Sequence, residues 1–212
     1  MLGQQHARFV DETAALPIEE IVDRIATLSE GLAAFWRNAE GWAPDDAAQL
    51  LRSARLDRIA SLAASLRRWT DGAPLSDGDL ILAWANQGAL LEGALKLFLT
   101  VYLTDYRADE TTKETRAWHI KRQMLQDPDE LMLDTILDYA EKAGLLAPQQ
   151  LALGRTVQAR RNAIHAFRDR DLGTDAELFA AIRDFRALLW SLDGRMEYPE
   201  ERFRPTERPS LR

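Results

Sequence analysis

The segment QARRNAIHAFRDRD, residues 158–171, places one of the three histidines of the chain close to fixed positive charge. Arg161 precedes His165 by four residues and Asn162 precedes it by three, and residues at these spacings share a face of a helix. Arg160 lies five residues before the histidine and borders the same face, about 140° away at 100° per residue. We therefore expect one helix face to present two guanidinium groups, an amide and an imidazole.

These side chains have the chemistry that RNA cleavage by transesterification needs. Arginine binds phosphate through paired planar hydrogen bonds, and histidine exchanges protons near neutral pH. A base takes the 2′-hydroxyl proton, a fixed cation stabilises the transition-state charge, and an acid protonates the leaving 5′-oxygen. The alternative is a solvated helix end that happens to contain a histidine, and spacing alone favours that alternative.

The same segment is the clearly basic part of an acidic chain. Five arginines against one aspartate lie in residues 155–170, whereas the formal net charge of the whole chain is −7. We expect Arg155 and Arg168 to contribute to a local binding site for an anionic ligand, although the acids of the following DRDLG stretch could neutralise its positive charge. The overall acidity argues against a protein that coats nucleic acid through bulk attraction.

The rest of the chain predicts an all-α bundle that positions this site. We expect a single domain with a helical hairpin over 16–70, a motif-bearing bundle over 79–195 and an extended tail over 196–212. Predicted helices cover 17–41, 44–69, 79–106, 118–125, 128–144, 147–167 and 174–195, with Thr174 or Asp175 as the last N-cap. Residues 107–117 are polar and predict a mobile loop.

The helix predicted over 79–106 is apolar nearly all round, which indicates a central helix or an oligomer interface. Its residues Glu92 and Lys96 lie one turn apart and predict a simple ion pair; the alternative is that Glu92 orients an arginine of the motif. Asn86 is predicted either to line the site or to pack within the bundle. The most apolar stretch, 89–103, is shorter than a membrane span, so we expect no membrane association.

The composition excludes some kinds of site. The chain has no cysteine, so disulfides, thiolate metal sites and a cysteine nucleophile are excluded. The start of the chain lacks the pattern of a secretory signal, and a cytoplasmic protein is expected. No Glu and His lie three residues apart, as paired helices of di-iron bundles require. We expect no metal and no cofactor.

The motif RRNAIH, with four residues between Arg160 and His165, resembles the arginine–histidine motif of the HEPN superfamily. The stretches WANQGALLEGALKLFLTVYLTDY, RRNAIHAF, DRDLG and EYPEE resemble a set of uncharacterised bacterial HEPN-like proteins, over roughly residues 80–200. Two departures stand out. Arg161 occupies the place of the polar residue that follows the first arginine in many of these motifs, so either arginine could face the cleft. Phe167 stands where minimal HEPN toxins have a modifiable tyrosine.

The resemblance implies a helical protein that dimerises and joins two arginine–histidine faces in one cleft. It implies a metal-independent endoribonuclease that leaves 2′,3′-cyclic phosphate ends and acts in phage defence, a toxin–antitoxin pair or a stress system. The catalytic residues are then Arg160, Arg161, Asn162 and His165. Other members of the superfamily lack catalysis, so the alternative is a helical module that binds RNA, a nucleotide or a partner protein such as an antitoxin.

Overall fold

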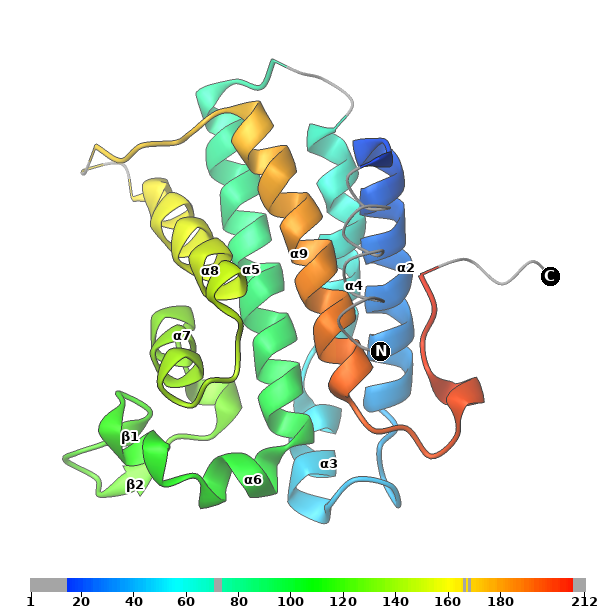
Figure 1. Ribbon diagram of the computed structural model, residues 1–212, viewed down its shortest axis with the longest axis vertical. Coiled ribbons are helices and arrows are strands. Elements are labelled where there is room, and N and C mark those ends of the chain that lie inside the picture. Colours follow the sequence, from blue (N-terminus) through cyan, green and yellow to red (C-terminus); the bar gives the residue numbers. More distant parts are fainter. Residues whose placement is uncertain (1–14, 71–73, 166, 168, 208–212) are drawn as a thin grey trace.

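The computed structural model describes residues 15–70, 74–165, 167 and 169–207, and over these residues the chain is an all-α bundle, as predicted (Figure 1). The α-helices are α2 (Ile18–Trp36), α3 (Asp45–Ser53), α4 (Leu56–Ser65), α5 (Asp77–Val101), α6 (Leu103–Ala108), α7 (Leu133–Lys142), α8 (Pro148–Arg161) and α9 (Asp175–Arg195). Short 3₁₀ helices cover Leu66–Trp69, Glu110–Glu114, Pro128–Glu130, Asn162–Ile164 and Glu201–Phe203. Within the described residues, no helix has the length and apolar character needed to cross a bilayer.

Helix α5 is the central element of the bundle, and this part of the prediction is confirmed. It packs against α4, α7, α8 and α9, and it runs behind α8 and α9 in Figure 1. Burial on several sides explains why its sequence is apolar nearly all round. The helix ends at Val101 and not at residue 106, because Tyr102 leaves helical geometry (φ −103°, ψ 36°) and α6 begins at the next residue.

The N-terminal part forms the predicted antiparallel hairpin, but its second arm is not one helix. Helices α2 and α4 run side by side, and α3 lies in the connection between them (Figure 1). Ala54 is extended (ψ 139°), and this separates α3 from α4. Leu51 and Leu56 are both buried, yet five residues along one helix would place them about 140° apart. The break lets both leucines reach the same core.

The polar stretch 107–117 is ordered, so the predicted mobile loop is wrong. It contains the end of α6 and the 3₁₀ helix Glu110–Glu114, in which Thr112 is buried. The hydroxyl of Thr112 donates to the Asp109 carbonyl (2.7 Å), and that of Thr115 donates to the Thr112 carbonyl (2.8 Å). Local hydrogen bonds satisfy these polar side chains, and so they do not need solvent.

Residues 118–125 form a small hairpin and not the predicted helix. Strand β1 (Trp118–His119) pairs antiparallel with β2 (Met124–Leu125), with Trp118 opposite Leu125 and His119 opposite Met124. Gln123 adopts a left-handed backbone (φ 51°) that closes the turn. A two-residue strand is too short to show alternation in a sequence, because alternation needs several residues on each face.

Both ends of α9 are fixed by contacts that the chain makes locally or with α2. Thr174 is the N-cap, as predicted, and its side chain and that of Glu177 form a capping box. The predicted tail is extended over much of its length but packs against the bundle. Pro205 lies against Gly31 of α2, and Arg186 of α9, buried to 1% exposure, pairs with Glu207.

Candidate functional site

The motif lies where α8 ends, and the helix ends earlier than predicted. The last α-helical residue is Arg161, and the 3₁₀ helix Asn162–Ile164 follows. His165 comes after that turn with non-helical geometry (φ −88°, ψ 89°), so the expectation that it sits on the helix one turn beyond Arg161 is wrong. Its backbone N–H donates to the Asn162 carbonyl (3.2 Å), and the residue is exposed.

Arg161 points into the bundle and pairs with Glu92 of α5. Its Nη1 donates to Glu92 Oε2 at 2.8 Å, and the two side chains are only 19% and 18% exposed. Lys96 Nζ lies 3.0 Å from Glu92 Oε1. Burial alone raises the pKa of the Glu92 carboxyl, but the hydrogen bonds from Arg161 and Lys96 outweigh it and hold that pKa below its ordinary value. Both predicted contacts of Glu92 are therefore present.

A glycine makes room for this arginine. A Cβ at Gly88 would overlap Arg161 Cδ and would lie 3.1 Å from Arg161 Cβ. The aliphatic stem of Arg161 thus lies directly on the backbone of α5, and its guanidinium reaches Glu92 one turn further on. This contact joins α8 to the central helix and commits Arg161 to the interior.

Arg160 points to the other side of α8 and meets the loop that follows the motif. It pairs with Asp171 and with Glu177, whose Oε1 lies 3.3 Å from Arg160 Nη2. The hydrogen bond with Arg160 holds the pKa of the exposed Asp171 carboxyl below its ordinary range. Gly173 (φ 71°) turns the chain beneath the guanidinium, where a Cβ would lie 3.1 Å from Arg160 Cζ. The structure therefore directs Arg160 away from α5, toward the loop around Asp171 and the start of α9, and its side chain is only 13% exposed.

A pocket of about 340 Å³ opens beside Arg160. It is lined by Thr156, Ala159, Arg160, Arg170 and Asp171. Within the described part of the chain, Arg170 has no ion pair, and its Nε is buried without a hydrogen-bond partner. Two guanidiniums and a hydroxyl around one concave space match the donors that recognise a phosphate. The sequence prediction missed Thr156 and Arg170, and the run of arginines was the available signal for the latter.

The other predicted binding residues do not join this pocket. Asn86 faces α4, where its Nδ2 donates to the Leu62 carbonyl (3.0 Å) and to Ser65 Oγ (3.1 Å), so the prediction that it lines the site is wrong. Arg155 pairs with Glu141 at 3.0 Å and ties α8 to α7. Arg168 lies outside the described residues.

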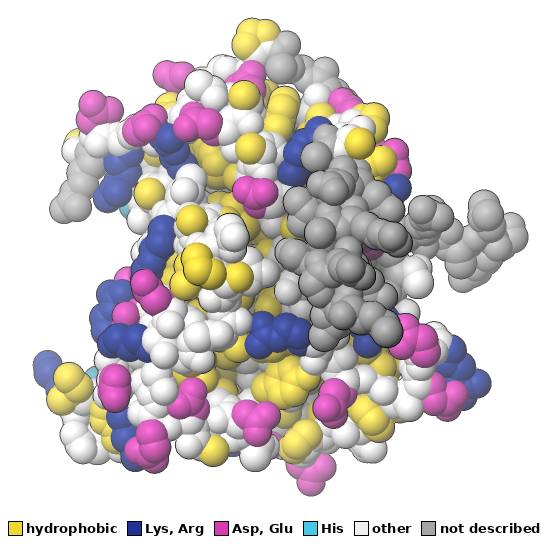
Figure 2. Space-filling model, viewed as in Figure 1, with side chains coloured by type: hydrophobic (Ala, Val, Ile, Leu, Met, Phe, Trp, Pro, Cys, Tyr) yellow, Lys and Arg dark blue, Asp and Glu magenta, His cyan; other side chains and the backbone are white. Residues whose placement is uncertain are grey.

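The loop after the motif is held to the central helix. Trp84 of α5 is fully buried, and its Nε1 donates to the Leu172 carbonyl at 2.8 Å. On the face shown in Figure 2, Lys and Arg side chains gather along the edge formed by α7 and α8, with Asp and Glu side chains between them. In the described ranges, no three His, Asp or Glu side chains are grouped so as to hold a metal ion.

The fold and site together define an all-α bundle with a cationic pocket and an exposed imidazole at the end of one helix. No family model, curated protein or solved structure matches the chain.

Proposed function

We propose that the protein is a metal-independent endoribonuclease of the HEPN type, with its site at the end of α8. The observation that supports this best is the cationic pocket lined by Arg160 and Arg170 beside α8. His165 follows Arg160 by five residues and is exposed, and one helical step plus a 3₁₀ turn keeps their Cα atoms on the order of 10 Å apart.

Phosphate binding is the first step of the proposed reaction. Asp171 and Glu177 hold Arg160 in the absence of a ligand, and their side chains are 81% and 52% exposed. Because the Asp171 carboxylate is 81% exposed, a phosphodiester can replace it on the guanidinium and supply another anionic partner in its place. Arg170 brings a second guanidinium that no carboxylate of the described residues occupies.

Proton transfer is the task of His165. A neutral imidazole takes the proton of the 2′-hydroxyl as that oxygen attacks the phosphorus. A protonated imidazole gives a proton to the 5′-oxygen as the P–O bond breaks. The products carry a 2′,3′-cyclic phosphate and a 5′-hydroxyl. A homodimer would bring two copies of His165 to one cleft, so that one copy acts as base and the other as acid.

Arg161 has a positioning role in this proposal. It anchors the end of α8 on Gly88 and Glu92 and leaves Arg160 directed toward the pocket. Arg160 is then the first member of the motif, with four residues between it and His165, as the resemblance implies.

The test is incubation of the purified protein with mixed RNA in EDTA, followed by analysis of the new ends. We expect cleavage with cyclic phosphate ends, and a loss of at least about 100-fold in His165→Ala. His119→Ala, at the histidine of the β1–β2 hairpin, is the matched control and should retain activity. Cleavage that requires magnesium, or that is unchanged in His165→Ala, would contradict the proposal.

The second candidate function is a non-catalytic module that binds a nucleotide or a partner protein such as an antitoxin. It is favoured by the ion pairs that already engage both arginines of the motif. In that case the wild type and His165→Ala would be equally inert toward RNA, while Arg170→Ala would weaken nucleotide binding. Light scattering distinguishes a dimer from a monomer of 24.0 kDa, and a monomer would exclude a cleft shared between two copies.

A further inference from the structure

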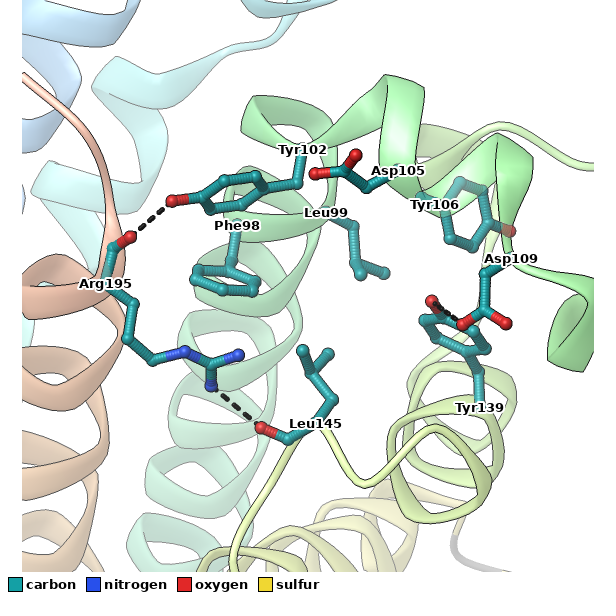
Figure 3. Close-up of a pocket in the computed structure, with 9 residues that line it drawn as sticks. All are labelled: Phe98, Leu99, Tyr102, Asp105, Tyr106, Asp109, Tyr139, Leu145 and Arg195. Atoms are coloured by element: carbon teal, nitrogen blue, oxygen red, sulfur yellow. Dashed lines mark hydrogen bonds between the residues drawn. The ribbon is translucent and has the colours of Figure 1, made fainter.

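A second pocket lies far from the motif, at the other end of α9. It has a volume of about 470 Å³. Its lining is Phe98, Leu99, Tyr102, Asp105, Tyr106, Asp109, Tyr139, Leu145 and Arg195, from α5, α6, α7 and the last residue of α9 (Figure 3). Glu177 and Arg195 are 18 residues apart on α9, which corresponds to roughly 27 Å at 1.5 Å per residue. The two pockets are therefore separate sites.

One edge of this pocket carries an uncompensated positive charge. The Arg195 guanidinium lies over the Phe98 ring, 4.6 Å from its centroid, and Nη1 donates to the Leu145 carbonyl at 2.8 Å. Burial lowers the pKa of Arg195, and in the described residues no carboxylate pairs with it. A guanidinium that has lost part of its water in this way is stabilised by a hydrogen-bonded anion.

The opposite edge carries negative charge. Asp105 is exposed, and its carboxylate makes no hydrogen bond or ion pair within the part of the chain that the structure describes. Asp109 accepts a hydrogen bond from the Tyr139 hydroxyl (2.9 Å). Burial raises the pKa of the Asp109 carboxyl, but hydrogen bonds from Thr111 and Tyr139 outweigh it, so the net pKa is lowered and the carboxylate is ionised. In Figure 3, Arg195 and Asp105 lie on different sides of Phe98 and Leu99.

The wall between Asp105 and Asp109 is aromatic and held in place. The rings of Tyr106 and Tyr139 meet edge to face with centroids 5.3 Å apart. The Tyr106 hydroxyl donates to the Gln126 carbonyl at 2.8 Å. Burial raises the pKa of both tyrosines, so both hydroxyls stay neutral. An aromatic ring or an aliphatic chain of a ligand can pack on this wall without breaking a hydrogen bond of either tyrosine.

We propose that this pocket binds a small zwitterion of the amino-acid type, with its carboxylate on Arg195 and its ammonium on Asp105. A ligand with only negative charge would meet the carboxylates of Asp105 and Asp109, and one with only positive charge would meet Arg195. A zwitterion satisfies both edges. The volume of about 470 Å³ lies in the range of small-molecule sites and leaves room for an apolar side chain beside Leu99.

Ligand-observed saturation-transfer NMR tests the proposal with the intact protein. The probes are the standard amino acids with 4-aminobutyrate and 6-aminohexanoate, each titrated to 10 mM. Phenethylamine and 3-phenylpropionate provide the matched single-charge controls for phenylalanine. We expect at least one zwitterion to bind, and its own amine-only and acid-only analogues to bind at least about tenfold more weakly. Absence of binding by every zwitterion, or equal binding by the single-charge analogues, would overturn the proposal.

Two variants locate the binding to this pocket. Asp105→Asn removes a charge that has no partner within the described residues, so we expect the fold to be retained. The substitution should lower the affinity for the zwitterion at least about tenfold. Asp77→Asn, at an exposed aspartate at the start of α5, is the matched control and should leave affinity unchanged. Arg195→Gln should weaken binding by a similar factor, with its melting temperature recorded to separate unfolding from lost affinity. Equal affinity in Asp105→Asn and Asp77→Asn would place the ligand elsewhere and overturn the assignment.

Discussion

Replacement of Gly88 by alanine tests the packing of Arg161 on the central helix. In the interior of a helix, alanine is favoured over glycine by about 0.8–1.0 kcal/mol. At this position the new Cβ would overlap Arg161 Cδ and would lie 3.1 Å from its Cβ. Overpacking costs about 1–3 kcal/mol, and a displaced Arg161 also loses its charged hydrogen bond to Glu92. We therefore expect Gly88→Ala to destabilise the protein by about 1–2 kcal/mol.

The sign should reverse once the arginine side chain is removed. In an Arg161→Ala background the overlapping Cδ is gone and the close contact that stays is the one with the Cβ of residue 161, at 3.1 Å, so Gly88→Ala should stabilise the protein by up to about 0.8–1.0 kcal/mol. The coupling between the two positions is then about 1–3 kcal/mol. Urea denaturation of the four proteins measures it, and urea is preferred to guanidinium because it does not screen the ion pair.

The comparison of the two backgrounds also separates the contact with Arg161 from a general effect of alanine in α5. Each kcal/mol of stability shifts the melting temperature by about 2–4 °C for a chain of this size, so calorimetry should detect the same reversal of sign. Gly88→Ala that stabilises the protein equally in both backgrounds would show that Arg161 does not lie on Gly88. The contact of Arg161 with the central helix, and with it the assignment of Arg160 as the arginine of the pocket, would then be wrong.

Two further predictions concern buried carboxylates. The pKa of Glu92 is lowered in the folded protein, so the stability that its ionised form contributes is fully present above the ordinary glutamate pKa and is lost as the pH falls through the folded pKa. Glu92→Gln should therefore lower the free energy of unfolding by about 1–3 kcal/mol at pH 7, and this difference from wild type should shrink below about pH 4. A difference that does not change with pH in urea denaturation would refute this prediction. Glu207→Gln leaves the buried guanidinium of Arg186 without this carboxylate and should cost about 3 kcal/mol. A Glu207→Gln protein with unchanged urea stability would contradict the docked tail.

Local interactions explain what could be predicted from the sequence. Apolar residues at three- and four-residue spacing, prolines at helix starts and the Thr174 cap act within a few residues, so they predict helices before any tertiary contact is known. The apolar character of the helix predicted over 79–106 likewise indicates a central helix or an oligomer interface, because exposed helices keep a polar face. Glu92 was correctly paired with Lys96, one turn away on the same helix.

The errors in the prediction arose where distant residues compete with local preference. Residues 44–69 have a helical pattern throughout, but burial of both Leu51 and Leu56 breaks the helix at Ala54. The polar residues 107–117 predicted a loop because their hydrogen-bond partners, such as the Thr112 contact with Asp109, are not visible in composition. Asn86 was a candidate site residue because a sequence does not show which face of a buried helix meets which neighbour.

The sequence by itself determined that two guanidiniums, an amide and an imidazole lie within five residues of one another, between Arg160 and His165, because these residues are neighbours along the chain. Only the tertiary structure decided their directions. Arg161 turns toward α5 because Gly88 and Glu92 lie there, about seventy residues earlier in the chain, while Arg160 turns to the opposite side and pairs with Asp171. The pocket of Arg195 likewise joins residues from 98 to 195. Such contacts depend on how helices pack, and local spacing carries no information about that packing.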